Sequence, residues 1–261
     1  MPYLEVNDIR LYYEEYGSGK PIIFLSGASG TIDYVENHWT NLTELFYKKY
    51  RVILIEHRGH GHTNNPRPYI SYELVADDIC QFIHKMKISP VHICGLSDGA
   101  IVALHIGMTN PHLAHTLICV GANYYNDDLV KLANQCIDTK LIELETPELA
   151  KLLSDWHDHG KGKDYWRTLV DQLSENLSKH PNYTLKDLKR IPVPTLLISG
   201  ENDLWANRQQ MIDMRQNIRS SEMLIINNAG HEVQYTHPQI VGPAILDFFE
   251  RNQDFWLTKS Y

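Results

Sequence analysis

Short apolar segments alternate along most of the chain with longer segments whose apolar residues recur at helical spacing. The apolar segments are typical of strands buried on both faces of a parallel sheet, and a segment of alternating pattern precedes them. The expected strands cover residues 9–16, 21–25, 51–55, 91–94, 116–120, 195–199 and 223–226. The expected helices cover residues 37–47, 72–86, 98–108, 208–217 and 239–251. This alternation predicts a three-layer α/β domain.

One segment interrupts the alternation. Residues 123–190 contain several short helical patterns rich in polar and aromatic residues, and no strand-like run. The chain then returns to the sheet after Ile191-Pro192-Val193-Pro194. We therefore expect a core domain formed by residues 1–122 and 191–261. Residues 123–190 are expected to form a helical cap, inserted between two strands and placed over the ends of the sheet.

Composition and charge exclude several classes of function. The net charge of −8 over 261 residues argues against nucleic acid as the main partner, because phosphate binding needs clustered Lys and Arg. The N-terminus has no basic region followed by an apolar stretch, so a signal peptide is not expected. No uncharged apolar run approaches the roughly 18 residues of a membrane span. The scattered cysteines favour buried free thiols and a cytoplasmic location; they are Cys80, Cys94, Cys119 and Cys136.

The strongest chemical signal is Gly95-Leu96-Ser97-Asp98-Gly99, between the strand expected at 91–94 and the helix expected from residue 98. In this strand–turn–helix context, G-x-S-x-G is the pattern of a serine nucleophile. The turn is tight enough to strain the serine backbone, and the two glycines relieve the crowding. The following helix N-terminus favours developing negative charge beside the hydroxyl. We therefore predict Ser97 as the nucleophile.

A serine hydroxyl is a weak nucleophile and needs an adjacent base. With such a turn, the acid and then the histidine are expected later in the chain, each after a late strand. The strand expected at 195–199 is followed by Gly200-Glu201-Asn202-Asp203, and the strand expected at 223–226 by a small-residue loop that ends at His231. We predict His231 as general base and Asp203 as the acid that orients it. Glu201 is the competing candidate for the third role.

A tetrahedral intermediate also needs two backbone N–H donors. One is expected from Asp98, the residue after the nucleophile. The other is expected from the segment Ser26-Gly27-Ala28-Ser29-Gly30, with Ala28 as the donor. The alternative interpretation of this segment is an ordinary glycine-rich turn.

These motifs together resemble the α/β-hydrolase superfamily from end to end of the chain. The segment Glu56-His57-Arg58-Gly59-His60-Gly61-His62-Thr63 is similar to the family's D-x-R-G-x-G-x-S loop, with Glu56 and Thr63 as departures. Ser26-Gly27 stands where the family usually has His-Gly. This departure leaves open whether the oxyanion loop is positioned as in the family. Within the superfamily, the chain most resembles the valacyclovir hydrolase (biphenyl hydrolase-like) serine esterases. The similar stretches are Ser97-Asp98-Gly99, Gly121-Ala122-Asn123 and Asp164-Tyr165-Trp166.

The resemblance implies an eight-stranded, mostly parallel sheet with a helical cap, and ester hydrolysis without metal or cofactor. In that group the acidic residue beside the nucleophile binds the substrate's α-amino group, and Asp98 matches that position. Tyr124, Trp156 and Trp205 are further candidates for substrate contacts. Cap packing explains such aromatic residues equally well.

Histidines in two segments raise the question of a metal site. His57, His60 and His62 lie close together, and His157 and His159 form another pair. The first group lacks the carboxylate and the geometry of a catalytic zinc site, so we expect no metal and interpret these residues as a solvent-exposed polar loop. His157 or His159 is a candidate for the cap side of the pocket.

The sequence therefore favours a serine hydrolase that cleaves small carboxylic esters, with α-amino-acid esters as a candidate class. Lactone, carbon–carbon bond or peptide hydrolysis by the same triad remains an alternative, because a fold does not determine one function. A ligand-binding receptor of the same fold is a further alternative, against which the intact triad counts. The expected partner is a small-molecule ester, with no nucleic acid and no membrane. The sequence leaves the oligomeric state open.

Overall fold

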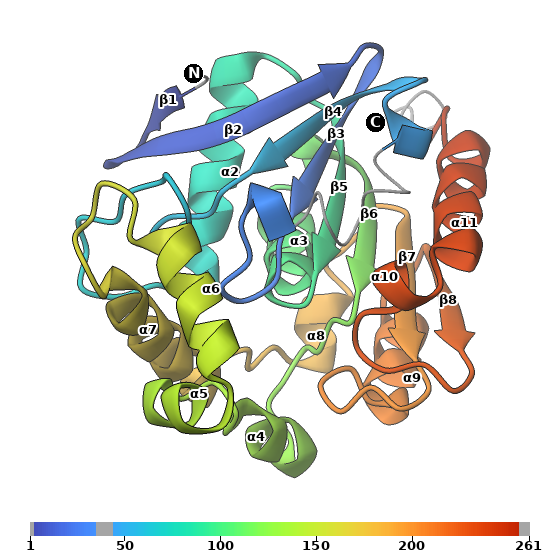
Figure 1. Cartoon of the computed structure of the whole chain (residues 1–261). Helices are drawn as coiled ribbons and strands as arrows, with labels where there is room; N and C mark the ends of the chain where they lie inside the picture. The colour runs from blue at the N-terminus through green and yellow to red at the C-terminus, as the bar shows by residue number, and fades with distance from the viewer. Residues whose placement is uncertain (1–2, 35–43, 256–261) are drawn as a thin grey trace.

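The computed structural model describes residues 3–34 and 44–255, and its centre is an eight-stranded sheet (Figure 1). The strands lie in the order β1-β2-β4-β3-β5-β6-β7-β8. β2 pairs antiparallel with β1 and β4, and all other neighbours are parallel. The predicted eight-stranded, mostly parallel sheet is confirmed. The strands are β1 (Tyr3–Val6), β2 (Ile9–Gly17), β3 (Lys20–Leu25), β4 (Tyr50–Ile55), β5 (Val91–Leu96), β6 (Ala114–Val120), β7 (Thr195–Gly200) and β8 (Ser221–Ile226).

The first strand does not appear among the strands expected from the apolar pattern. β1 has four residues, of which only Val6 is buried, so it contains no apolar run. It is held at the edge of the sheet by antiparallel pairing with β2, where Tyr3 lies opposite Tyr12. The helix expected over residues 37–47 falls mostly outside the described residues.

Side chains of alternate residues in the central strands pack into two apolar cores, one on each face of the sheet. In β3, Ile23 and Leu25 pack in the core beneath α2, α3 and α9, whereas Ile22 and Phe24 pack in the core beneath α11. Both faces are therefore covered, as a parallel sheet requires. These helices are α2 (Tyr72–Met86), α3 (Asp98–Thr109), α9 (Arg208–Asn217) and α11 (Pro238–Arg251).

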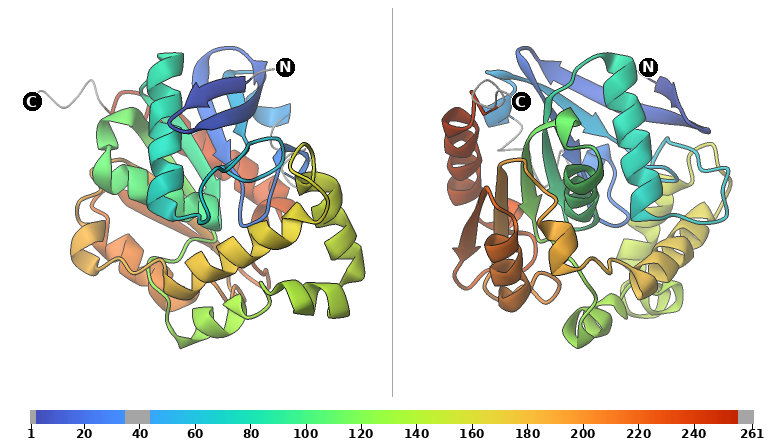
Figure 2. Two further views of the ribbon diagram at one scale, coloured as in Figure 1. Left: turned by 90° about the vertical axis from the view of Figure 1, so that its left-hand side faces the viewer. Right: turned by 180° about the vertical axis from the view of Figure 1, so that it is seen from behind.

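The segment between β6 and β7 contains only helices among its regular elements. Figure 2 shows α4 to α7 grouped beyond one end of the sheet. Local capping defines the starts of α4 and α5, because Asp127 accepts a hydrogen bond from the Val130 N–H and Asp138 accepts one from the Leu141 N–H. The division into core and cap domains at residues 123 and 190 remains a prediction. The helices are α4 (Asp128–Asn134), α5 (Thr139–Glu145), α6 (Pro147–His157), α7 (Tyr165–Lys179) and α8 (Leu185–Leu188).

All four cysteines are free thiols. Cys80, Cys94 and Cys119 are buried, as expected, but Cys136 is exposed. It differs because it follows α4 in the helical segment, whereas the others lie in α2, β5 and β6. None of the helices within residues 3–34 and 44–255 is long and apolar enough to cross a membrane.

Candidate active site

Ser97 lies in a sharp turn between β5 and α3. Its backbone has a φ of +51° and a ψ of −118°, a strained conformation for a residue with a side chain. The flanking glycines are needed because there is no space for side chains. A Cβ on Gly95 would lie 2.2 Å from the Gly99 carbonyl oxygen, and a Cβ on Gly99 would lie 2.5 Å from the Leu25 carbonyl oxygen. The expected strand–turn–helix arrangement is therefore present.

His231 and Asp203 are 28 residues apart in sequence but adjacent in space. The Nδ1 atom of His231 lies 2.9 Å and 3.0 Å from the two carboxylate oxygens of Asp203. Because a carboxylate only accepts hydrogen bonds, Nδ1 carries the proton and Nε2 is left as a base. Glu201 is not the hydrogen-bond partner of His231 Nδ1; its carboxylate accepts a hydrogen bond from the Asn228 N–H.

The surroundings of this pair keep Asp203 ionised and favour protonation of His231. Burial raises the pKa of Asp203, but the hydrogen bond and charge of His231 and the N–H groups of Ala206 and Trp205 hold it below its usual value. Burial lowers the pKa of His231, but the hydrogen bond and charge of Asp203, with smaller effects of Glu232 and Asp98, raise it above 6.5. The imidazolium that forms during proton transfer is thus stabilised.

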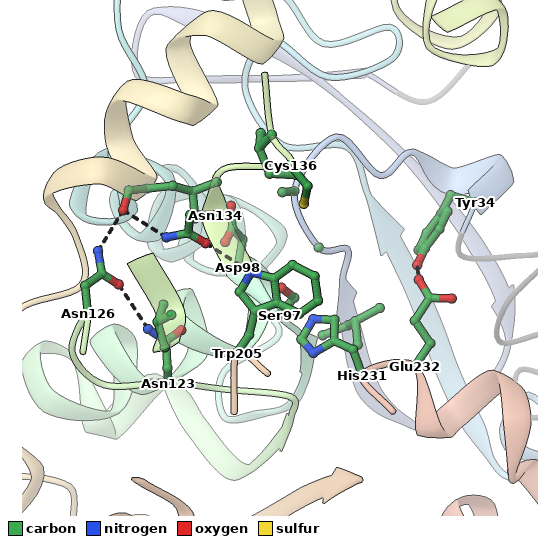
Figure 3. Close-up of a pocket in the computed structure, with 16 residues that line it drawn as sticks. Tyr34, Ser97, Asp98, Asn123, Asn126, Asn134, Cys136, Trp205, His231 and Glu232 are labelled. Carbon is green, nitrogen blue, oxygen red and sulfur yellow. Dashed lines mark hydrogen bonds between the residues drawn. The ribbon is translucent and has the colours of Figure 1, made fainter. Parts of the chain in front are cut away.

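Ser97 and His231 line one cavity of about 150 Å³, together with Ala28 and Asp98 (Figure 3). Gly27 lies against the nucleophile, since a Cβ on it would be 3.2 Å from the Ser97 Cβ. The Asp98 N–H belongs to the first turn of α3, where backbone donors have no intrahelical partner. Both predicted oxyanion donors therefore line the same cavity as the nucleophile.

Asp98 is a buried carboxylate at the wall of this cavity. Only 6% of the residue is exposed, and its Oδ1 accepts a hydrogen bond of 2.9 Å from the Tyr72 hydroxyl. Burial raises the pKa of Asp98 to about 6, although the Tyr72 hydrogen bond and the charge of His231 act in the opposite direction. No lysine or arginine in the described ranges forms an ion pair with it.

The three aromatic residues expected to contact substrate occupy different positions. Trp205 lines the cavity, and its ring centroid lies 4.8 Å from that of His231. Tyr124 does not line the cavity, because its hydroxyl donates to Asp213 of α9. Trp156 also lies outside the lining and packs edge-on against the ring of Tyr34, which does line it. Packing therefore accounts for the positions of Tyr124 and Trp156.

Three asparagine side chains form a wall that the sequence analysis did not identify. Asn123 donates to Asn126, and both Asn126 and Asn134 donate to the Leu177 carbonyl oxygen (Figure 3). Asn134 also accepts a hydrogen bond from the Trp205 indole N–H. Asparagines at these positions carry no distinctive spacing, so only the tertiary structure brings them together.

The interpretation of His57, His60 and His62 as a solvent-exposed loop is wrong for the first two. His57 and His60 are 4% and 2% exposed. The loop is buried because α6 lies against it: the Gly61 N–H donates to Nδ1 of His157, whose Nε2 then donates to the Ser29 carbonyl oxygen. His62 is partly exposed and stacks on His159.

The histidines proposed for the cap side of the pocket do not line it, and those considered for a metal site do not form one in the described residues. His157 is fully buried between α6 and the loop, and neither it nor His159 lines the cavity of Ser97. Within the described part of the chain, no group of three or more His, Cys, Asp or Glu side chains has the arrangement to hold a metal ion.

Comparisons with known proteins identify the family of the chain. The model of the alpha/beta hydrolase family matches residues 22–243. The human serine hydrolase BPHL is 24% identical over 94% of this chain and 84% of its own length. The (E)-2-((N-methylformamido)methylene)succinate hydrolase of Acinetobacter baylyi is 22% identical over 94% of this chain and 95% of its own length.

Solved structures show the same fold. The meta-cleavage product hydrolase of Pseudomonas fluorescens has a TM-score of 0.80 at 19% identity, over 96% of this chain and 98% of that one. The enol-lactonase of Burkholderia xenovorans has a TM-score of 0.74 at 20% identity, over 95% and 100%. The match of the family model confirms the family resemblance seen in the motifs. With a family model matching most of its length, the chain belongs to the alpha/beta hydrolase family.

Proposed function

We propose that the protein is a serine hydrolase that cleaves small carboxylic esters through Ser97, His231 and Asp203. The observation that carries the proposal is that His231, which contacts Asp203, lines the same cavity as the strained Ser97. Nucleophile, base and orienting acid are the three groups that acyl transfer to serine requires. The cavity of about 150 Å³ suits a small reacting group.

In the first step, Ser97 Oγ attacks the ester carbonyl carbon while Nε2 of His231 takes the hydroxyl proton. The carbonyl oxygen becomes an oxyanion, which the N–H groups of Ala28 and Asp98 stabilise. The protonated His231 then gives its proton to the departing alcohol, leaving an acyl-enzyme on Ser97. A water activated by His231 hydrolyses the acyl-enzyme and restores the serine. Asp203 holds the histidine tautomer throughout and stabilises the imidazolium.

The test is Ser97→Ala, assayed with p-nitrophenyl acetate and butyrate and labelled with a fluorophosphonate probe. We expect an unchanged circular dichroism spectrum, loss of nearly all turnover and no covalent label. A folded variant within tenfold of wild-type activity would remove Ser97 from the mechanism. A wild-type protein that takes no label would instead favour the ligand-receptor alternative.

We further propose that α-amino-acid esters are preferred substrates, with the ammonium held by Asp98. The supporting observation is a buried carboxylate that lines the cavity one residue from the nucleophile, with a tyrosine hydroxyl as its hydrogen-bond partner. An α-ammonium group lies close to the scissile carbonyl carbon, within reach of such a carboxylate. A charge-assisted contact of this kind contributes about 1.5–3 kcal/mol.

Asp98→Ala separates this role from the oxyanion role, because it keeps the backbone N–H and removes only the carboxylate. We expect kcat/KM for valyl and phenylalanyl esters to fall by roughly 10- to 150-fold, while acetate and butyrate esters change little. Equal losses for both classes would assign Asp98 a structural role and end the amino-ester proposal.

Carbon–carbon bond or lactone hydrolysis by the same triad is the second candidate. Its support comes from relatives, since a 2-hydroxy-6-oxononadienedioate hydrolase of Pseudomonas putida is 24% identical to the chain, and an enol-lactonase shares its fold. A panel of p-nitrophenyl esters, amino-acid esters, lactones and dienoic diketo acids ranks these reactions by kcat/KM.

A further inference from the structure

A second cavity lies between the helices α5, α6 and α7, next to the cavity of Ser97. Its volume is about 320 Å³, roughly twice that of the cavity that holds the nucleophile. Most of its walls are aliphatic. The aliphatic part is formed by Ile137, Leu141, Ile142, Leu149, Leu153 and Val170, and Glu145 and Thr146 add polar groups to the lining.

The two cavities share part of their walls. Cys136 and Ile137, which follow α4, line both of them. Ser29 lines the second cavity and directly follows Ala28, the predicted oxyanion donor in the first. Cys136 and Ile137 therefore form the boundary between the two cavities, which an apolar group attached to a carbonyl at Ser97 would have to pass to reach the second one.

The walls of the two cavities have different chemistry. The cavity of Ser97 also has apolar lining, but asparagine amides and Asp98 border it and suit polar groups near the reacting bond. The second cavity exposes aliphatic side chains, and two of them, Leu141 and Leu149, remain 44% and 39% accessible to solvent. An apolar substituent lying there would remove this apolar surface from water, which is favourable.

We propose that the second cavity is a subsite for a linear apolar substituent of the ester, entered past Cys136 and Ile137. This inference rests on the proposed ester hydrolysis at Ser97. A dry cavity of about 150 Å³ holds a benzene molecule, so 320 Å³ accommodates a chain of roughly six to ten carbons. The substrate class becomes esters with a medium-length alkyl chain on one side of the reacting carbonyl.

The subsite predicts a dependence of turnover on chain length. Each methylene group that becomes buried contributes about 0.8 kcal/mol, which corresponds to about a fourfold gain in kcat/KM at best. We therefore expect kcat/KM to rise two- to fourfold per carbon as the chain enters the cavity, and then to level off. The rise is measured in two series, p-nitrophenyl esters with acyl chains from acetate to decanoate and acetate esters with alcohols of increasing length.

A matched pair of variants on α6 tests the location. Leu149→Trp fills the cavity from its exposed rim, and Leu152→Trp is the control, because Leu152 has a similar exposure of 40% but does not line the cavity. For Leu149→Trp we expect at least a tenfold loss on octanoate and a change of less than twofold on acetate. Leu152→Trp should follow the wild type. A flat wild-type profile in both series, equal losses on acetate and octanoate, or equal effects of the two variants would overturn the subsite.

Labelling of Cys136 gives a second readout that does not depend on turnover. Cys136 is exposed, whereas Cys80, Cys94 and Cys119 are buried, so N-ethylmaleimide should modify Cys136 selectively. In Ser97→Ala protein, we expect octanoate to slow this modification and acetate to leave it unchanged. Leu149→Trp introduced into that protein should abolish the protection.

The two readouts distinguish failure of the inference from failure of the proposed function. A wild-type protein without esterase activity, whose Cys136 is still protected by octanoate, would reject ester hydrolysis and retain the apolar subsite. Active protein without a chain-length dependence and without protection would retain ester hydrolysis and reject the subsite.

Discussion

Gly121 follows β6 with a φ of +64°, and its Cα faces the proposed base and acid. A Cβ at this position would lie 2.7 Å from Cε1 and 2.9 Å from Nδ1 of His231, and 3.4 Å from a carboxylate oxygen of Asp203. The glycine is thus required twice, by its left-handed backbone and by the close approach of the imidazole. The close approach of His231 to Gly121 is visible only in the tertiary structure.

We predict that Gly121→Ala lowers kcat/KM by about 100-fold, because the methyl group displaces the His231 ring and a misplacement near 1 Å has a cost of that order. Ester hydrolysis under saturating and limiting substrate measures the effect. The control is Gly160→Ala, which has a similar φ of +67° but nothing within 4 Å of the added Cβ. If both variants lost activity equally, backbone strain alone would explain the loss.

At the scale of elements, a buried ion pair ties the loop after β4 to α2. Arg58 is fully buried, and its Nε and Nη2 lie 2.7 Å and 2.8 Å from the two carboxylate oxygens of Asp78. Nη2 also donates to Asp8 in the turn between β1 and β2. The loop that packs against His157 of α6 is therefore anchored to the sheet side of the molecule by one guanidinium group.

We predict that Asp78→Ala reduces the free energy of unfolding by about 3–5 kcal/mol, because it leaves the Arg58 charge buried without its main partner. Urea denaturation followed by circular dichroism measures the change. Asp77→Ala is the control, since Asp77 is the neighbouring but exposed carboxylate. It should change stability by no more than about 0.5 kcal/mol. Equal effects of the two substitutions would contradict the importance of the buried pair.

At the scale of the whole molecule, the candidate site is assembled from segments spread over most of the chain. The residues that follow β3, β5, β6, β7 and β8 meet at one end of the sheet, and α4 and α7 contribute further walls. This enclosure buries Asp98 and brings the half-buried His231 close enough for each charge to alter the pKa of the other. The pH dependence of the protein therefore reflects its tertiary packing.

We predict that selectivity for amino-acid esters over neutral esters is lost as the pH falls through about 6, the pKa to which burial raises Asp98. Between this pH and the α-amino pKa of about 7.7–8, the carboxylate is charged and binds the ammonium; one unit below the pKa of Asp98, only about a tenth of the carboxylate is ionised. The ratio of kcat/KM for valyl and acetate esters measures this, because both substrates need neutral His231 and its titration cancels. Asp98→Ala should show a flat ratio. A flat ratio in the wild type would count against the amino-ester proposal.

The local pattern of the sequence by itself determined most of the fold and pointed to the main residues of the candidate site. Strands buried on both faces must be apolar along their length, so seven of the eight strands are visible as apolar or alternating segments. The turn at Ser97 needs glycines at fixed positions, and this requirement also leaves a local signal. Asp203 and His231 were identifiable because each follows a late strand in the order that the fold demands.

Only the tertiary structure decided which side chains from distant segments meet. β1 depends on pairing at the sheet edge, His57 and His60 are buried because α6 covers their loop, and Tyr124 turns toward Asp213. The asparagine wall and the cavity beside Cys136 arise in the same way. Burial and hydrogen bonding at these positions depend on how separate helices pack over the sheet. The spacing of residues within one segment does not determine that packing.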